Sequence, residues 1–449
     1  MSFTLELLKQ NIHSYNDASC LWVAYSGGCD SHVLLHALVA IRSQISPEIK
    51  AIHINHGLSP LATEWEEHCR LTCEKLDVPY VAISVNAKAR KSSPEEAARH
   101  ARYAEWKKLI KNNEVLLLAH HQDDQAETLL IQLMRGAGVK GLASMPLQQA
   151  FAGGLLCRPL LGFLREELYC YAIDNNLHWI DDPSNFDTDF DRNFLRHDII
   201  PLLETRWPGL KKTLSRTASH QAEANDLLNG LAEQDWLLVQ SGQQIKISAL
   251  VQLNVKRQRN LLRYWIGQVR KLSLPDTVHL QRIINEVLTA AEDAKPEVTW
   301  QGGEVRRYQG LLYAQTKQAE TDGNTSLQWP KLEQALTLPS NNKQLVSNVL
   351  VGEGLSQAKL KNKELSIRFR QGGETCRPVG RGQTHQLKKL FQEWQVPPWL
   401  RGHIPLFFVD NELAAVVGYC ICEPFAAAEG EAGYAIGLID SNSSDSGTA

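Results

Sequence analysis

The chain has 449 residues, of which 43% are hydrophobic and 22% charged, ordinary values for a globular protein of roughly two to four domains. It contains no apolar run long enough to span a bilayer and no basic-then-apolar leader, so neither a membrane anchor nor secretion is expected. Nine cysteines in so long a chain favour free thiols in a reducing, cytoplasmic setting, and the net charge of −3 offers no general attraction for nucleic acid.

Residues 1–215 alternate between predicted strands and predicted helices. The strands are short apolar runs at residues 21–25, 49–54, 81–85 and 115–119, and helical periodicity follows each of them. This alternation predicts an α/β fold with a doubly wound parallel sheet. Ligands bind beyond the carboxyl ends of such strands, where this sequence has its most polar motifs.

The remainder of the chain predicts two smaller domains. Residues 216–320 are mainly helical, with a long helix over 215–231 and a strand pair over 298–314. Residues 345–440 mix short strands with glycine-rich loops, which predicts a C-terminal α+β domain.

The strongest motif follows the first predicted strand and precedes a helix: Ser26-Gly27-Gly28-Cys29-Asp30-Ser31. Its glycines permit a tight bend and a close approach to an anion, and the helix offers unpaired N–H groups. Ser26 and Ser31 add hydroxyl donors, and Asp30 can hold Mg²⁺. No lysine follows the glycines, so this is not the usual P-loop. The alternative is an ordinary strand–helix turn with polar caps.

A second motif follows the fourth predicted strand: His120-His121-Gln122-Asp123-Asp124-Gln125-Ala126-Glu127-Thr128. Asp124 and Glu127 are three residues apart and share a helix face, which suits a cationic amino acid or Mg²⁺. The same carboxylates can instead cap a helix N-terminus, and chemistry alone leaves the two interpretations level.

These motifs carry a resemblance to known families. The first resembles the PP-loop of ATP pyrophosphatases, which cleave ATP between the α and β phosphates. The second resembles the tRNA(Ile)-lysidine synthetases. Further stretches agree: His53-Ile54-Asn55-His56-Gly57-Leu58-Ser59, Ala98-Arg99-His100-Ala101-Arg102-Tyr103, Arg158-Pro159-Leu160-Leu161, and residues 179–185 leading to Asp191-Arg192-Asn193-Phe194-Leu195-Arg196. The likeness is dense over residues 20–205 and returns near the C-terminus at residues 387–391 and 396–401. Asn55 stands where that family often has histidine, which leaves the role of this position open.

The resemblance implies an enzyme that ligates free L-lysine to C2 of the wobble cytidine in a CAU-anticodon tRNA(Ile), through a base adenylated by ATP. Codon reading then changes from AUG to AUA. ATP and Mg²⁺ are the implied cofactors, the cytoplasm is the implied location, and a homodimer is left open.

The resemblance also implies roles for individual residues. The ATP-binding set is Ser26, Gly27, Gly28, Cys29, Asp30, Ser31, Ile52 and His53, and Asp30 is the expected Mg²⁺ ligand. The catalytic set is Asp30, Arg102, Asp124 and Glu127, of which Asp124 and Glu127 hold lysine. Arg192 and Arg196 are expected to face the RNA, although Arg192 can instead pair with Asp189 or Asp191.

Residues 355–405 contain ten Lys/Arg and three Asp/Glu, so their net charge is 10 − 3 = +7. Lys388, Lys389 and Arg401 are the expected tRNA contacts, with Phe391, Trp394 and Trp399 beside them as candidate stacking residues. Ordinary core packing of the aromatic residues is the alternative.

The nearest rival function is a PP-loop tRNA thiolase. Such chemistry usually needs a Cys-x-x-Cys pair, whereas the close pairs here are Cys69/Cys73 and Cys420/Cys422. A catalytically silent tRNA-binding protein is the rival from another class, and it would not need the intact phosphate motif.

Overall fold

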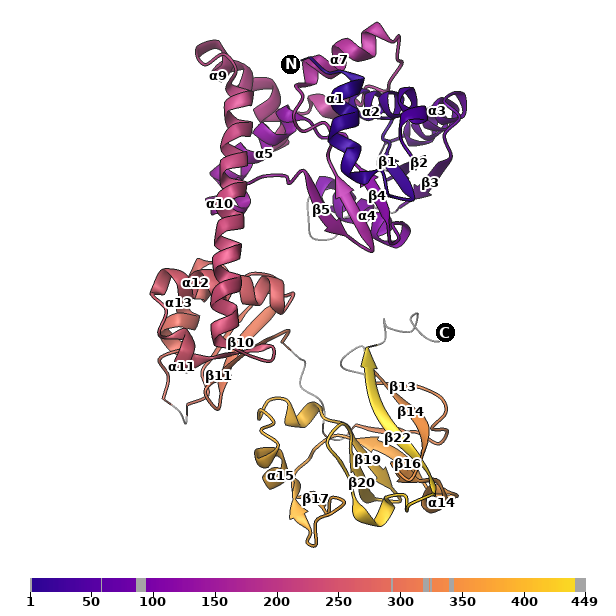
Figure 1. Ribbon diagram of the computed structural model, residues 1–449, viewed down its shortest axis with the longest axis vertical. Helices are drawn as coiled ribbons and strands as arrows, with labels where there is room; N and C mark the ends of the chain where they lie inside the picture. The colour runs from indigo at the N-terminus through magenta and orange to yellow at the C-terminus, as the bar shows by residue number, and fades with distance from the viewer. Residues whose placement is uncertain are drawn as a thin grey trace. The chain divides into compact units, whose positions relative to one another are not determined.

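The computed structural model describes residues 2–57, 59–85, 94–291, 294–317, 323, 325–338 and 343–440. The chain divides into two compact units, Met1–Asn229 and Gly230–Ala449. Figure 1 shows the order of their helices and strands. No helix within the described ranges is long and apolar enough to cross a membrane.

A six-stranded sheet forms the centre of the first unit, with strand order β3-β2-β1-β4-β6-β5. Its strands are β1 (Cys20–Ala24), β2 (Glu48–Asn55), β3 (Tyr80–Ser84), β4 (Glu114–Leu117), β5 (Gln148–Phe151) and β6 (Gly154–Cys157). All pairings are parallel except β5 with β6. The predicted doubly wound sheet is therefore confirmed, and the β5–β6 hairpin is an addition that the sequence pattern did not predict. The strand order reverses between β1 and β4, which is where ligands bind in such sheets.

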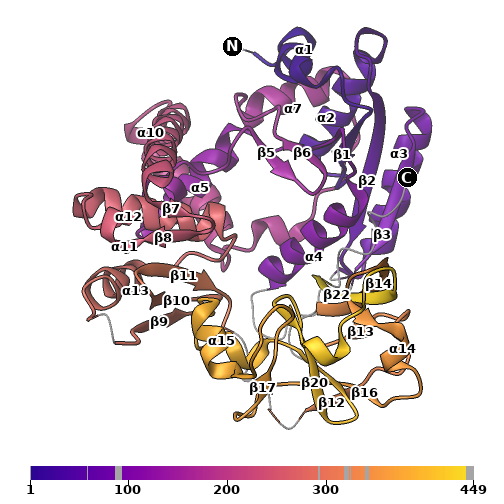
Figure 2. The same cartoon turned by 60° about the horizontal axis from the view of Figure 1, so that its bottom comes forward.

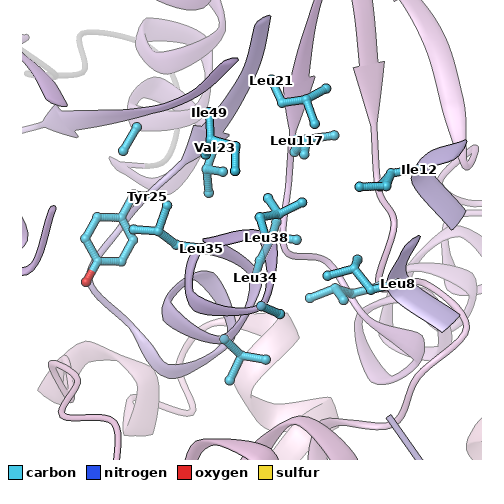
Figure 3. Packing of buried hydrophobic residues seen from close by; sticks show 14 of the residues in the cluster. Leu8, Ile12, Leu21, Val23, Tyr25, Leu34, Leu35, Leu38, Ile49 and Leu117 are labelled. Carbon is cyan, nitrogen blue, oxygen red and sulfur yellow. The ribbon is translucent and has the colours of Figure 1, made fainter. Parts of the chain in front are cut away.

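Helices cover both faces of this sheet because the strands are apolar on both faces. On β1, Leu21 and Val23 pack against Leu34 and Leu38 of α2 (Cys29–Ala40), with α1 (Leu5–Ile12) alongside (Figure 3). Trp22, between them in sequence, belongs to a second buried cluster on the other face with residues of α4 (Pro94–Leu109). This alternation holds the end of β1 rigidly at the start of the phosphate motif.

The other helices of the first unit include those that carry the polar motifs. They are α3 (Ala62–Lys75), α5 (Gln122–Met134), α6 (Val139–Leu142), α7 (Arg165–Asp174), α8 (Asp191–Phe194) and α9 (Ile200–Arg206). A π-helical turn, Leu195–Ile199, joins α8 to α9. Helix α10 (Leu210–Val239) extends beyond the predicted 215–231 helix at both ends and runs uninterrupted across the boundary between the units (Figure 1).

The second unit contains separate antiparallel sheets, visible in Figure 2. The first has the order β7-β8-β11-β10-β9, with β7 (Gln240–Ser241), β8 (Gln244–Lys246), β9 (Glu297–Trp300), β10 (Gly303–Tyr308) and β11 (Leu311–Gln315). It packs with α11 (Ile247–Leu250), α12 (Val255–Tyr264) and α13 (Thr277–Arg282) around one hydrophobic cluster. The predicted strand pair over 298–314 is thus three strands.

The C-terminal part of the second unit has its own buried clusters. One sheet is β12 (Ser326–Gln328), β16 (Leu365–Arg368), β19 (Leu406–Val409), β20 (Glu412–Val416) and β21 (Cys420–Ile421). Another is β13 (Leu336–Thr337), β14 (Lys343–Val351), β22 (Ala432–Asp440) and β15 (Leu355–Ser356), and a third pairs β17 (Thr375–Cys376) with β18 (His385–Gln386). Helices α14 (Gln357–Leu360) and α15 (Leu387–Glu393) complete this part.

Candidate active site

The turn between β1 and α2 has a backbone shape that only glycine fits easily. Gly27 has a φ of +84°, and a Cβ atom there would lie 2.6 Å from Ile180 Cδ1 and 2.9 Å from Cys69 Sγ. The backbone N–H of Ile180 also donates to the carbonyl of Gly27 over 2.9 Å. Gly27 is therefore required by both conformation and close packing.

Ser31 fixes the conformation of this loop from inside. Its Oγ donates to the carbonyl of Gly28 over 3.0 Å and accepts from the N–H of Ser26 over 3.2 Å. Ser26 Oγ lies 3.0 Å from Ser31 Oγ. Gly28 is the N-cap of α2, so the first-turn amides of this helix have no carbonyl partner within it. The loop thus presents N–H groups and the positive end of a helix, which suits phosphate oxygens.

Asp30 occupies the first turn of α2, beside these amides. Its Oδ1 is buried without a hydrogen-bond partner among the described residues, and its Oδ2 lies 3.5 Å from Nε2 of His121. Mg²⁺ in nucleotide sites usually takes one or two carboxylates together with phosphate oxygens and water. A lone buried carboxylate oxygen at the edge of a phosphate loop fits that pattern. Within the described ranges, no group of three or more His, Cys, Asp or Glu is arranged to hold a metal ion.

His121 connects the phosphate loop to helix α5. It is 1% exposed and precedes the first turn of that helix. Its Nε2 lies 3.4 Å from Asp124 Oδ2, and its backbone N–H donates to the same oxygen over 2.9 Å. Asp124 is therefore a helix-capping residue as well as a member of the charged cluster, so the two interpretations of the motif are compatible.

Two arginines close over the carboxylates of α5. Arg192 donates from Nε to Glu127 over 2.7 Å and from Nη2 to Asp124 over 2.9 Å. Arg196 donates from Nε to Glu127 over 2.7 Å and from Nη2 to Asp124 over 3.2 Å. Arg192 thus pairs with Asp124 and Glu127, residues far away in sequence, rather than with Asp189 or Asp191. Asp124 and Glu127 thus lie on one face of α5, and the guanidinium groups of both arginines contact that face.

Charges in this cluster determine the protonation of its members. Burial raises the pKa of Asp124, but the charges of His121, Arg192, His120 and Arg196 outweigh burial and hold it below its usual value. Burial lowers the pKa of His121, but Asp124 and Asp30 reverse this, and its pKa ends above the usual value. Burial lowers the pKa of neighbouring His120 to about 3. The two adjacent histidines are therefore shifted in opposite directions, the pKa of His120 towards the neutral form and the pKa of His121 towards the cation.

The remaining residues expected at the ATP site lie around the same sheet edge, with different exposure. His53 is buried and its Nδ1 lies 3.0 Å from the carbonyl oxygen of Tyr25. Ile52 is 1% exposed and packs in the core, so its side chain is unavailable to adenine, and only its backbone remains a candidate contact. Arg102 is half-buried on α4, and burial together with its charge lowers the pKa of His56 to about 4.

Two residues of this cluster were absent from the predicted site set. His121 bridges Asp30 and Asp124, and Lys211 of α10 lies with its Nζ 2.6 Å from Asp123 Oδ2. His121 lies within the second motif, so the sequence pattern could have predicted it as a site residue. Lys211 is 88 positions beyond Asp123 in the chain, and no local pattern pairs them.

The C-terminal basic residues differ from expectation in part. Lys388 and Lys389 are exposed on α15, as a phosphate contact requires. Arg401 is 8% exposed and donates to the carbonyl of Val396 over 2.9 Å and to the Tyr308 hydroxyl over 3.2 Å. The guanidinium group of Arg401 is therefore buried as a packing element, which does not favour the tRNA contact expected from the sequence. Phe391 is likewise fully buried.

The charge of +7 also overstates the positive field of this region. Lys363 lies 2.5 Å from Asp410, and Arg377 lies 2.9 Å from Glu423. Both acids fall outside the 355–405 window used for the count. Ion pairs with acids outside the window thus neutralise part of the excess.

The fold and the loop after β1 define the first unit as a PP-loop domain, and the family model of that description matches residues 3–203. Two further models match, a TilS substrate binding domain over residues 245–313 and a TilS substrate C-terminal domain over residues 365–438. The tRNA(Ile)-lysidine synthase of Coxiella burnetii is 43% identical over 433 residues, which cover 96% of each chain. That of Legionella pneumophila (strain Lens) is 42% identical over 406 residues, covering 90% of this chain and 92% of the relative. The chain belongs to the tRNA(Ile)-lysidine synthase family.

Among solved structures, the U34-tRNA thiolase NcsA from Methanococcus maripaludis covers 49% of this chain and 78% of its own, at 19% identity and a TM-score of 0.42. A likeness this distant carries no functional weight. Of the two close cysteine pairs in the sequence, Cys69 and Cys73 are both fully buried in the core, which disfavours this pair as sulphur-transfer residues.

Proposed function

We propose that the chain joins lysine to C2 of the wobble cytidine in a CAU-anticodon tRNA(Ile), using ATP and releasing AMP and pyrophosphate. The observation that carries this proposal is family membership along nearly the whole chain, 96% of it at 43% identity, together with a complete phosphate loop. The reaction makes the chain a ligase acting on tRNA. We place it in the cytoplasm, where its substrates occur.

The first step activates the base. The cytosine O2 attacks the α-phosphorus of ATP, the bond to the β-phosphate oxygen breaks, and pyrophosphate leaves. The amides of the Ser26–Ser31 loop would bind the phosphates and stabilise charge on the leaving group. Asp30 would hold Mg²⁺, which supplies further charge neutralisation when bound. Arg102, on the helix near the end of β2, is a candidate partner of the α-phosphate.

The second step forms the new C–N bond. A neutral lysine amine attacks C2, the C2–O bond to AMP breaks, and the amine loses a proton. Adenylation makes this possible because it turns a poor leaving group into a good one and splits one difficult step into two. We propose Asp124 and Glu127 as the site of the lysine. Because both carboxylates already contact Arg192 and Arg196, lysine binding would change an existing ion-pair network.

RNA contacts are proposed at two places. Arg192 and Arg196 have side chains that are 26% and 22% exposed, so their outer N–H groups remain candidates for the anticodon loop. Lys388 and Lys389 are candidates for phosphates elsewhere on the tRNA. Unstacked anticodon bases are the usual target of sequence-specific RNA recognition.

Incubation with ATP, labelled lysine and total tRNA tests the proposal. We expect ATP-dependent label in tRNA(Ile) with a CAU anticodon and none in tRNA(Met). The wobble nucleoside should gain the mass of one lysine less one water, because the C2 oxygen leaves with AMP. Absence of lysine from the RNA, or incorporation of sulphur instead, would overturn it. Gel filtration of the same preparation tests the homodimer.

A further inference from the structure

Asp123 joins three helices at the edge of the proposed active site. It lies in the first turn of α5 and is 7% exposed. Its Oδ1 accepts the backbone N–H of Arg165, at the start of α7, over 3.0 Å. Its Oδ2 lies 2.6 Å from Lys211 Nζ, on α10. Asp123 is adjacent to Asp124, and its Oδ1 lies 3.7 Å from His121 Nδ1.

The position of Lys211 is electrostatically unfavourable within its own helix. It is the second residue of α10, whose first turn contains no acidic residue. The N-terminal end of a helix carries positive partial charge, so a lysine there is unfavourable. Residues that break a local rule often do so for a function elsewhere. Here the compensating charge comes from Asp123, with Glu204 a further 3.6 Å contact of the same ammonium.

The pair remains charged at neutral pH. Burial raises the pKa of Asp123, but the hydrogen bond from Lys211 and the one from the Arg165 amide leave it below its usual value. Burial lowers the pKa of Lys211, but the hydrogen bond to Asp123 reverses this. The contact is thus a charge-assisted hydrogen bond with directional geometry.

We propose that Lys211 is a positioning residue for tRNA adenylation: through Asp123 it fixes the first turn of α5, and with it His121 and Asp124, relative to the phosphate loop. Contacts connect the first turn of α5 to the phosphate loop, since His121 Nε2 lies 3.5 Å from Asp30 and 3.4 Å from Asp124. This inference rests on the proposed function.

The same contact ties the catalytic turn to a helix that leaves the domain. Helix α10 continues without interruption to Val239, beyond the boundary at Asn229. The segment that follows it, residues 245–313, matches a substrate binding domain. A tRNA bound there can bias the orientation of α10, and Lys211 is the side chain through which that bias reaches α5. Lys211 therefore affects turnover with tRNA more than affinity for ATP.

Lys211→Met tests this, because it keeps most of the unbranched side chain and removes the charge. Lys212→Met is the matched control, since Lys212 is exposed in the same helical turn. Adenylation is measured at saturating ATP and tRNA(Ile), with rates normalised to competent sites by the pyrophosphate burst. We expect Lys211→Met to lower kcat by about 10- to 100-fold, the usual cost of a small misplacement, with the Kd for ATP changed less than about twofold. Lys212→Met should match wild type, and Lys211→Arg should recover most of the loss.

Unchanged kcat in Lys211→Met, or an equal loss in Lys212→Met, would overturn the inference. So would a Lys211→Met variant whose loss of activity is fully explained by a smaller fraction of competent sites in the pyrophosphate burst, because the pair would then serve stability alone. Wild-type protein that forms no lysidine would overturn the proposed function itself. If the wild-type protein forms lysidine and Lys211→Met has the same kcat, only this inference fails and the proposed function stands.

Discussion

Charged residues mark two regions of this sequence, the 120–128 motif in the first unit and residues 355–405 in the second. In the first region the charges converge: Asp124 and Glu127 meet Arg192 and Arg196, and His121 links Asp124 to Asp30. In the second region they disperse, because Arg377 and Lys363 pair with acids beyond the window. A motif tied to a strand end and a helix start predicts where side chains meet, whereas a charge count ignores which residues fold back onto each other.

The largest expected effect lies in the first region. Asp30→Ala should lower tRNA adenylation by about 10³-fold, as the loss of a key electrostatic group does elsewhere, because the carboxylate beside the phosphate loop would be absent. Pyrophosphate release with tRNA(Ile) measures this. Asp17→Ala, an exposed aspartate of the same unit, should behave as wild type. Near-normal activity of Asp30→Ala would reduce that residue to a helix-capping role.

Substitution of the α5 carboxylates should separate the lysine site from the ATP site. We expect Asp124→Asn or Glu127→Gln to raise KM for lysine about tenfold, the scale of one hydrogen bond to a charged group, and KM for ATP much less. Steady-state kinetics with each substrate varied decides this, with exposed Glu223→Gln as the control. If ATP binding is lost instead, these carboxylates hold the metal and the assignment to lysine fails.

A smaller effect probes the backbone that shapes the phosphate loop. Gly27→Ala adds a Cβ at 2.6 Å from Ile180 Cδ1, whereas Gly136→Ala meets nothing within 4 Å although Gly136 also has positive φ. Gly27→Ala should therefore cost about 1–3 kcal/mol of unfolding free energy through overpacking, beyond the cost of Gly136→Ala. Urea unfolding of both variants gives the difference. Equal costs would mean that conformation alone, and not close packing, explains this glycine.

The smallest effect belongs to the second region. Lys388→Ala with Lys389→Ala should weaken tRNA binding and reduce the salt slope by about one for each phosphate that the variant no longer binds, with ATP affinity unchanged. Arg381→Ala is the contrast, because Arg381 lies 2.6 Å from Glu393 and should change the slope less. Filter binding across a salt series measures both variants. An unchanged slope in the double variant would make this an ordinary solvated surface.

The sequence predicts the parallel sheet well, because apolar runs buried on both faces leave a strong local signal. It also predicts the phosphate loop, since glycine at positive φ and the start of a helix are local features. It does not predict the β5–β6 hairpin, whose strands have only four residues each. The pairing of Lys211 with Asp123 and the burial of Arg401 depend on tertiary packing over long sequence distances, so no local pattern reveals them.

Activation by ATP of the RNA base, and not of the amino acid, is the central claim. With ATP labelled at the α-phosphate, tRNA(Ile) and no lysine, label should accumulate on the tRNA as pyrophosphate is released. Added lysine should then discharge the label as AMP while one lysine enters the RNA for each AMP released. Label on lysine instead, formed without tRNA, would contradict this claim.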